Sequence, residues 1–193
     1  SELSELTVAA LEEAATYPAE FISPILDEFI TSPCPPWNVL AITFTNKAAN
    51  EMKERLGRMF DDPEVPKSIW AGTFHSVCVR LLRRFGSQIG LDNNFTIYDA
   101  TDSLKLMSTV MKDKNIDDKV LPAKNVLNVI GRLKDKLTTP EEFAVQAEAS
   151  RDFGMRRTAE LYKEYDKRMR EADAMDFDDL LVNTYSLFEQ FPQ

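Results

Sequence analysis

Short apolar runs alternate with helix-periodic stretches over the middle of the chain. Residues 39–44 form a brief apolar run with β-branched side chains, which predicts a buried strand. Apolar positions then recur at helical spacing after Asn46, the predicted N-cap of the next helix. A second strand is predicted at 68–73, and the helix that follows it ends at Gly86. Residues 38–86 are therefore predicted to form two successive strand–helix units.

Successive units of this kind are typical of a parallel sheet with helices packed on its faces. In such sheets, ligands bind beyond the carboxyl ends of the strands. Two polar stretches fall at these ends, T-F-T-N at 43–46 and G-T-F-H-S at 72–76. Both stretches are therefore candidate binding elements.

From residue 99 onward the pattern is helical. Asp99 and Asp176 are predicted N-caps of two of these helices. Thr139 begins a capping box with Pro140 in the first helical position, which is a strong signal for a helix start. The predicted fold class is therefore α/β and mostly helical.

The charge of the chain is unevenly distributed. The net charge is −9, but residues 1–46 contain seven acidic residues and no Lys or Arg, which leaves 25 acidic and 23 basic residues in the remainder. The total charge therefore does not exclude a nucleic-acid partner, because local potential decides binding. The two cysteines match no zinc spacing and favour a reducing compartment. No apolar run approaches the roughly 18 to 20 residues of a membrane span, so we expect a cytoplasmic protein without a membrane partner.

The first polar stretch, Thr43, Phe44, Thr45 and Asn46, has two interpretations. It can be an ordinary helix cap beside a core phenylalanine. Alternatively, amides at the helix start and the polar side chains hold phosphates, while Phe44 stacks on a base. The second stretch repeats this composition one strand–helix unit later, which favours a contact with single-stranded nucleic acid.

His75 in the second stretch is the only histidine of the chain. No serine, aspartate or second metal ligand is spaced around it as a hydrolytic triad or a zinc site requires. A hydrogen-bonded structural histidine and a contact to phosphate or sugar both stay open. The strand-end position favours the contact.

A basic cluster lies in the helical half of the chain. Arg132, Lys134 and Lys136 follow an apolar stripe. They are either a solvated helix face or a patch for the backbone of a nucleic-acid duplex, which would bind without sequence preference.

The chain contains no evident site for magnesium or nucleotide. Three aspartates lie within residues 176–179, but N-cap and first-turn positions account for Asp176 and Asp179 without a metal. A phosphate-binding loop needs G-x-x-x-x-G-K-[ST], yet the first glycine is Gly57 and no such loop occurs. No predicted strand ends in an Asp-Glu pair that could hold magnesium. We therefore predict no catalytic residue, no metal site and no ATP hydrolysis by the chain itself.

Four segments carry a family resemblance: PPWNVLAITFTNKAANEMKERL, WAGTFHS, FTIYDATD and MDFDDLL. In order and spacing they resemble the UvrD/Rep/PcrA-like superfamily 1 DNA helicases. The resemblance implies ATP-driven 3′-to-5′ translocation on single-stranded DNA by a first RecA-like domain with a parallel sheet and a helical insertion. It divides the chain into an acidic leader of unknown origin at 1–34, a partial RecA-like domain at 35–94 and 173–193, and a helical insertion subdomain at 95–172.

The resemblance also implies a set of DNA contacts. The segment GRLKDKL, which contains the basic cluster, resembles a duplex-contacting element. The residues that match the two single-strand contact motifs of the family are Thr43, Phe44, Thr45, Asn46 and Lys47 for the first and Thr73, Phe74 and His75 for the second.

Two departures from the family pattern shape the expected function. Members place the phosphate-binding loop near where Ala9 to Tyr17 stand, and AALEEAATY contains none of it. The chain also stops before the family's magnesium-binding Asp-Glu motif. We therefore expect a helicase fragment that binds single-stranded DNA, or its junction with a duplex, and has no cofactor of its own, whereas the parent family uses ATP and magnesium.

An incomplete parallel sheet also has consequences for association. An unpaired sheet edge invites pairing with another chain, so self-association is expected. The alternative to a helicase fragment is a non-catalytic, helicase-derived module that binds DNA or protein.

Overall fold

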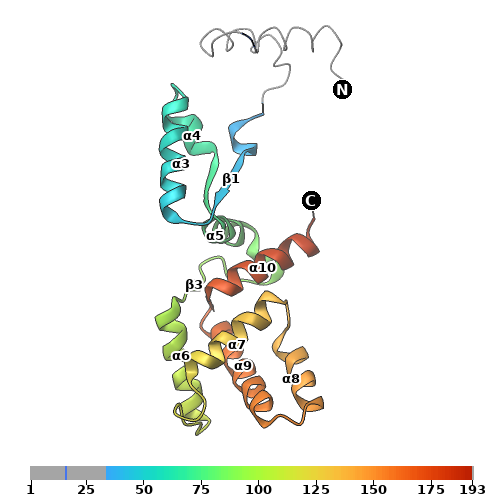
Figure 1. Cartoon of the computed structure of the whole chain (residues 1–193). Coiled ribbons are helices and arrows are strands. Elements are labelled where there is room, and N and C mark those ends of the chain that lie inside the picture. The colour runs from blue at the N-terminus through green and yellow to red at the C-terminus, as the bar shows by residue number, and fades with distance from the viewer. Residues whose placement is uncertain (1–15, 17–33, 193) are drawn as a thin grey trace. The chain divides into compact units, whose positions relative to one another are not determined.

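The structure, a computed structural model, describes residue 16 and residues 34–192 (Figure 1). The predicted acidic leader therefore lies outside the described residues, apart from residues 16 and 34. The chain divides into two units, residues 1–41 with 52–71, and residues 42–51 with 72–193. Both hydrophobic cores and all the predicted DNA contacts belong to the second unit.

The two predicted strand–helix units are present. A 3₁₀ turn, η1 (Pro36–Asn38), precedes β1 (Leu40–Thr43) and α3 (Asn46–Met59). A short helix, α4 (Glu64–Ser68), then precedes β2 (Trp70–Thr73) and α5 (Phe74–Phe85). β1 and β2 are hydrogen-bonded neighbours in a two-stranded sheet. The predicted order of strand, helix, strand and helix is therefore confirmed.

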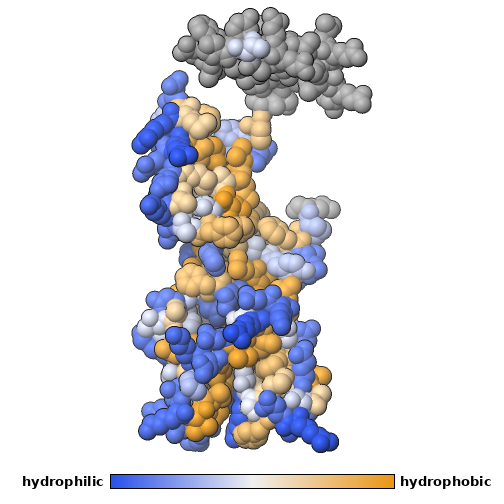
Figure 2. Space-filling view, viewed as in Figure 1, coloured by the Kyte–Doolittle hydropathy of each residue, from blue (hydrophilic) through white to orange (hydrophobic). Residues whose placement is uncertain are grey.

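The predicted N-cap of α3 is wrong by one residue. The Oγ1 atom of Thr45 accepts a hydrogen bond from the backbone N–H of Ala48 at 3.2 Å, and Asn46 is already the first helical residue. A threonine in this position satisfies an amide of the first turn that has no partner within the helix. The solvent side of α3 is strongly hydrophilic (Figure 2), and Ala49 is its one buried residue.

α5 packs against the last helix, α10 (Phe177–Gln190), and against the 3₁₀ helix η2 (Gly86–Ile89). Leu82 and Leu180 are fully buried where these elements meet. The buried residues of this small core are Cys78, Leu82, Phe95, Met175, Leu180 and Leu187.

The predicted helical half forms a second core. Its helices are α6 (Ala100–Asp113), α7 (Ala123–Asp135), α8 (Pro140–Ala149) and α9 (Phe153–Glu171), which pack on one another (Figure 1). Met107, Ile130 and Tyr165 are fully buried or nearly so in this core. None of the helices among the described residues is long and apolar enough to cross a membrane.

Three predicted helix starts are confirmed. Asp99 accepts hydrogen bonds from two amides of the first turn of α6. Thr139 and Asp176 each form a capping box with the acidic residue three positions later. These signals are local, since each joins a side chain to amides within three residues, and the sequence therefore reveals them.

Two very short strands flank the helices α6 to α9 in the sequence and pair with each other. β3 (Thr96–Ile97) pairs in parallel with β4 (Ala174–Met175), and the backbone N–H of Tyr98 donates to the carbonyl of Met175 at 2.9 Å. The sequence analysis did not predict these strands, because two residues are too few to show alternation. The pairing joins the point where the chain enters the helices α6 to α9 to the point where it leaves them.

Candidate nucleic-acid interface

Two aromatic side chains lie together where β1 and β2 end. Phe44 follows β1 and is 86% exposed, and Phe74 follows β2 and is 41% exposed. Their ring centroids are 5.2 Å apart, with the planes tilted by 38°. The two polar stretches, which lie one strand–helix unit apart in the sequence, thus meet through their aromatic residues. Large exposed aromatic side chains of this kind can stack on the bases of a single strand.

The threonines beside these rings have a local role. Thr45 caps α3, and Thr73 caps α5 by accepting a hydrogen bond from the backbone N–H of Ser76 at 3.3 Å. The Ser76 hydroxyl in turn donates to the carbonyl of Thr73 at 2.8 Å. Both threonines therefore cap a helix, but the expectation of a core phenylalanine beside the cap is wrong, because Phe44 is 86% exposed. The caps also fix where each helix begins, and so where the adjacent phenylalanine points.

Two further residues of the predicted contact set are exposed to a ligand. Asn46 and Lys47 are exposed on the first turn of α3, whereas Thr43 is half-buried at the end of β1. Amides at a helix start, together with an exposed lysine, suit a phosphate group.

His75 is half-buried and contacts an aromatic residue from the far end of the sequence. The ring of Phe177, the first residue of α10, meets the imidazole edge-on at a centroid distance of 5.4 Å and an angle of 88°. Phe177 is itself 48% exposed. The sequence analysis did not select this residue, although it lies within the MDFDDLL segment, which was the available signal.

The three residues of the predicted basic cluster do not share one exposed face. Arg132 and Lys136 are exposed, but the side chain of Lys134 is only 5% exposed. Residues four apart share a helix face, while a residue midway between them points to the opposite side. Lys134 therefore faces the interior and is not free to neutralise a phosphate. Helical periodicity was the signal that could have separated it from its neighbours.

Lys134 is held by two carboxylates of α10. Its Nζ lies 2.7 Å from Oδ2 of Asp176 and 2.7 Å from Oδ1 of Asp179. The hydroxyl of Tyr165 on α9 also donates to Oδ2 of Asp176 at 3.1 Å, and the ammonium lies 5.5 Å from the centre of the same tyrosine ring. We call Lys134, Asp176, Asp179 and Tyr165 the lysine cluster.

The electrostatics of the lysine cluster follow from its burial and its net negative charge. Burial raises the pKa of the Asp179 carboxyl to about 6, and the charge of Asp176 adds to this against the opposing effect of Lys134. Burial also acts to raise the pKa of Asp176, but Lys134, the capping amide and the tyrosine hydroxyl together lower it. The pKa of Lys134 is raised, because its two carboxylate partners outweigh burial.

Comparison with known proteins shows the family of the chain. Residues 23–193 match the model of the UvrD/REP helicase N-terminal domain. The chain belongs to this family. It is similar to the ATP-dependent DNA helicase PcrA of Staphylococcus epidermidis, with 44% identity over 172 residues, which is 89% of this chain and 22% of the relative. The similarity to the ATP-dependent DNA helicase PcrA of Staphylococcus aureus strain Mu50 has the same identity and coverage.

The chain thus spans about a fifth of the length of these helicase relatives, 22% in both cases. The family match covers most of the chain and confirms the resemblance carried by the four sequence segments. It begins at residue 23, within the segment that the sequence analysis set apart as a leader.

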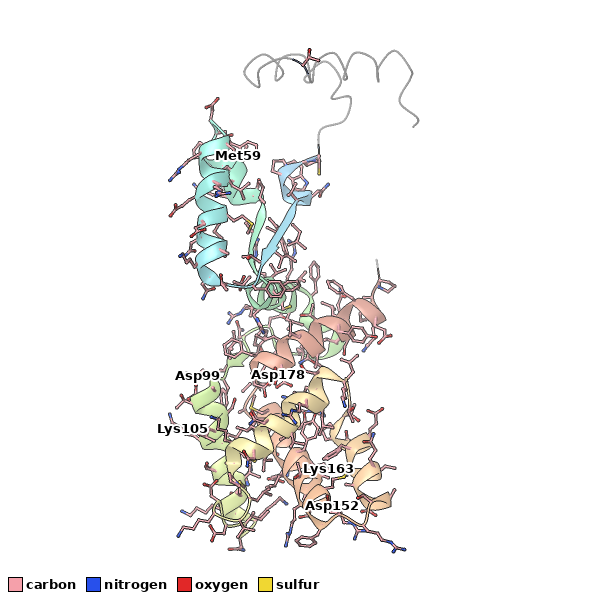
Figure 3. The ribbon with its side chains drawn as sticks, in the orientation of Figure 1. Met59, Asp99, Lys105, Asp152, Lys163 and Asp178 are labelled. Carbon is pink, nitrogen blue, oxygen red and sulfur yellow. The ribbon has the colours of Figure 1, made fainter. Side chains whose placement is uncertain are left out.

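Two of the three aspartates at 176–179 of this UvrD/REP domain have hydrogen-bond and ion-pair partners within the chain. Asp176 and Asp179 form the capping box of α10, as the cap interpretation predicted, and they also pair with Lys134, which was not predicted. Asp178, labelled in Figure 3, lies beside α7, where a methyl group on Gly131 would stand 3.0 Å from its carboxylate. Among residue 16 and residues 34–192, no group of three His, Cys, Asp or Glu side chains could hold a metal ion.

Two hollows lie on either side of the lysine cluster. One, of about 470 Å³, is lined by Lys134, Asp179 and Tyr162, among others. The other, of about 480 Å³, is lined by Asp176, Phe177 and Tyr98, among others. The start of α10 is therefore incompletely surrounded by packed side chains.

Proposed function

We propose that this chain is the single-strand-contacting part of the first motor domain of an ATP-dependent 3′–5′ DNA helicase, together with its helical insertion. Residues 35–94 and 173–193 then belong to the motor domain, and residues 95–172 form the insertion. The observation that carries the proposal is the exposed aromatic pair Phe44 and Phe74 at the ends of β1 and β2. Membership of the UvrD/REP family supports the helicase origin.

The chemistry of the aromatic edge suits a flexible single strand. A base can stack on the open face of Phe44, and such stacking is indifferent to sequence because every base has an aromatic face. Asn46 and Lys47 offer donors and a positive charge to the neighbouring phosphate. Phe74, His75 and Phe177 extend the aromatic surface toward α10. In this proposal the threonines shape the edge by capping, without contacting the strand.

The insertion is proposed to approach the duplex ahead of the strand. Arg132 and Lys136 lie on the same exposed face of α7 and its C-cap, and both can neutralise backbone phosphates. We leave Lys134 out of this contact, because its charge is already paired.

Hydrolysis of ATP is proposed to require parts of a helicase that this sequence does not contain. No G-x-x-x-x-G-K-[ST] loop occurs among its 193 residues. We therefore expect the chain to bind DNA without turning over ATP. ATP and magnesium are assigned to the longer helicases that it resembles.

The test is a titration of a dye-labelled oligo(dT) with the 193-residue chain, read by fluorescence anisotropy at low and moderate salt. Phe44→Ala is expected to weaken binding roughly 5- to 150-fold, since one base stack contributes about 1–3 kcal/mol. His75→Ala is expected to weaken binding as well. Phe153→Ala is the matched control, because Phe153 is also exposed (69%) but lies on α9 of the insertion.

Equal affinity for Phe44→Ala and Phe153→Ala, or no binding even at low salt, would refute the DNA contact. The second result would leave a protein-binding module as the better account of the chain. ATP turnover above background, measured with and without oligo(dT), would refute the claim that hydrolysis needs other parts.

A further inference from the structure

Lys134 joins the middle of the helical insertion to the first turn of α10, 42 residues later in the sequence. We propose that Lys134 is a positioning residue: by holding Asp176 and Asp179 it sets how Phe177 meets His75, and so couples the insertion to the aromatic edge. This proposal rests on the proposed function only where it concerns DNA. The contact between Phe177 and His75 can be tested without DNA.

All four carboxylate oxygens of Asp176 and Asp179 have a partner. Oδ1 of Asp176 accepts from the backbone N–H of Asp179 at 2.9 Å, and Oδ2 of Asp179 accepts from the backbone N–H of Asp176 at 3.2 Å. The two remaining oxygens contact Lys134 at 2.7 Å each. The ammonium therefore fastens the capping box itself, and the two aspartates cannot turn independently.

Phe177 is one of the two residues between these aspartates. Phe177 follows Asp176 directly, so its backbone is fixed by the same capping box. Its ring is half exposed and contacts His75 edge-on at 5.4 Å. A small rotation of the first turn of α10 would therefore change this contact before it changed the buried core around Leu180.

The other contacts between the insertion and α10 are the packing of α7 on α10, the close approach of Asp178 to Gly131 and the pairing of β3 with β4. β3 and β4 pair over only two residues each. A hollow lies on each side of the lysine cluster, one lined by Lys134 and Asp179 and the other by Asp176 and Phe177. The ion pairs of Lys134 hold both capping residues, Asp176 and Asp179, and they therefore contribute directly to the direction of the first turn.

The burial of the lysine cluster has a cost in folding free energy. Burying a lysine and two carboxylates is costly, and well-packed apolar residues often give equal or greater stability in such a place. What a buried ion pair adds is directional specificity, because only one arrangement satisfies all the charged groups. The lysine cluster is therefore better explained as a device for orientation than as a source of stability.

The experiment uses the single histidine as a probe. In the 193-residue chain the ring resonances of His75 are unambiguous in a ¹H–¹³C NMR spectrum, and they report the ring current of Phe177. Phe177→Leu defines their positions when that ring is absent. All spectra are recorded at the same pH, so that the chains differ only in the substitution.

Lys134→Met is expected to move the His75 resonances toward their positions in Phe177→Leu, although Lys134 does not contact the histidine in the structure. Lys163→Met is the control, because Lys163 is an exposed lysine on α9 (Figure 3), and it is expected to leave them unchanged. Unmoved resonances in a folded Lys134→Met chain, with folding checked by circular dichroism, would overturn the proposal. Should that variant not fold, Asp179→Asn provides the test, since it keeps the shape but removes one charge and should cause a smaller movement in the same direction.

The oligo(dT) titration separates this proposal from the proposed function. Lys134→Met is expected to bind oligo(dT) more weakly than Lys163→Met. If the His75 resonances move but the unsubstituted chain binds no DNA, the positioning role stands and the proposed function fails. If the chain binds DNA but the resonances do not move, the proposed function stands and the positioning role fails.

Discussion

Lys134 and Asp179 form an ion pair, but removing the charge of Lys134 should lower the unfolding free energy far more than removing the charge of Asp179. The lysine cluster contains two carboxylates and one ammonium, so it has an excess negative charge in a buried place. Lys134→Met leaves two buried carboxylates without a cationic partner. Asp179→Asn instead leaves one carboxylate facing one ammonium, with nearly unchanged shape.

The magnitudes follow from burial and from the pKa of Asp179. Removing one partner of a buried ion pair costs about 3–5 kcal/mol, which is the expected loss of unfolding free energy for Lys134→Met at pH 7. For Asp179, the pKa rises from an ordinary 3.8 to about 6 in the folded chain, mainly because of burial. At about 1.36 kcal/mol per pKa unit, its ionisation lowers the unfolding free energy by about 3 kcal/mol at pH 7.

The sign of the pH dependence is determined by where the proton binds more tightly. A carboxyl with a higher pKa in the folded chain retains its proton there after the unfolded chain has lost it. The contribution of Asp179 to the unfolding free energy therefore falls as the pH rises from about 4 to above 6. Asn mimics the protonated carboxyl, so the stability of Asp179→Asn relative to the unsubstituted chain should rise by up to about 3 kcal/mol between pH 4 and pH 7.

The assay is urea unfolding followed by far-UV circular dichroism at pH 4, 5, 6 and 7. The difference between the unsubstituted chain and Asp179→Asn reports the titration of this carboxyl together with its effect on Asp176, because the remaining titrating groups are present in both chains. Either of two results would refute the reasoning: a larger loss at pH 7 for Asp179→Asn than for Lys134→Met, or parallel pH profiles for Asp179→Asn and the unsubstituted chain.

Three further predictions concern helix caps, the strand end and the sheet edge. Thr139→Ala removes the hydrogen bond that its Oγ1 accepts from the backbone N–H of Glu142, and it should cost about 1 kcal/mol in urea unfolding, whereas Thr109→Ala, an exposed threonine within α6, should cost less. Gly72→Ala should destabilise the chain because the new methyl group would overlap the Ser76 hydroxyl, and adding Ser76→Ala should recover most of the loss; a loss that persists in the double variant would contradict this. The sheet of β1 and β2 has two strands among the described residues, so light scattering is expected to detect oligomers that increase with protein concentration, and a monomer at every concentration would contradict this.

Local signals explain what could be predicted about the fold. The caps at Asp99, Thr139 and Asp176 each involve amides within three residues, so the sequence contains all the information. The strand–helix order is likewise visible in the hydrophobic periodicity. Thr45 replaced Asn46 as the cap of α3 because neighbouring polar residues compete for one amide, and periodicity places a helix start only to within a residue or two.

Long-range contacts explain what could not be predicted about the site. Helical periodicity could have separated Lys134 from Arg132 and Lys136, but only the packing of α7 against α10 showed which carboxylates Lys134 meets. The contact between His75 and Phe177 joins residues that are far apart in the sequence, and no spacing rule connects them. β3 and β4 are too short to leave a pattern.

The sequence by itself determined the family, the order of strands and helices, and the polar and aromatic residue types at the strand ends. These properties depend on residue identity and on interactions within one helix turn or one strand. Only the tertiary structure decided that Phe44 contacts Phe74, that His75 contacts Phe177 and that Lys134 is buried in an ion pair. The physical reason is that such contacts depend on how separate elements pack, and packing satisfies buried charge and apolar area over the whole unit at once.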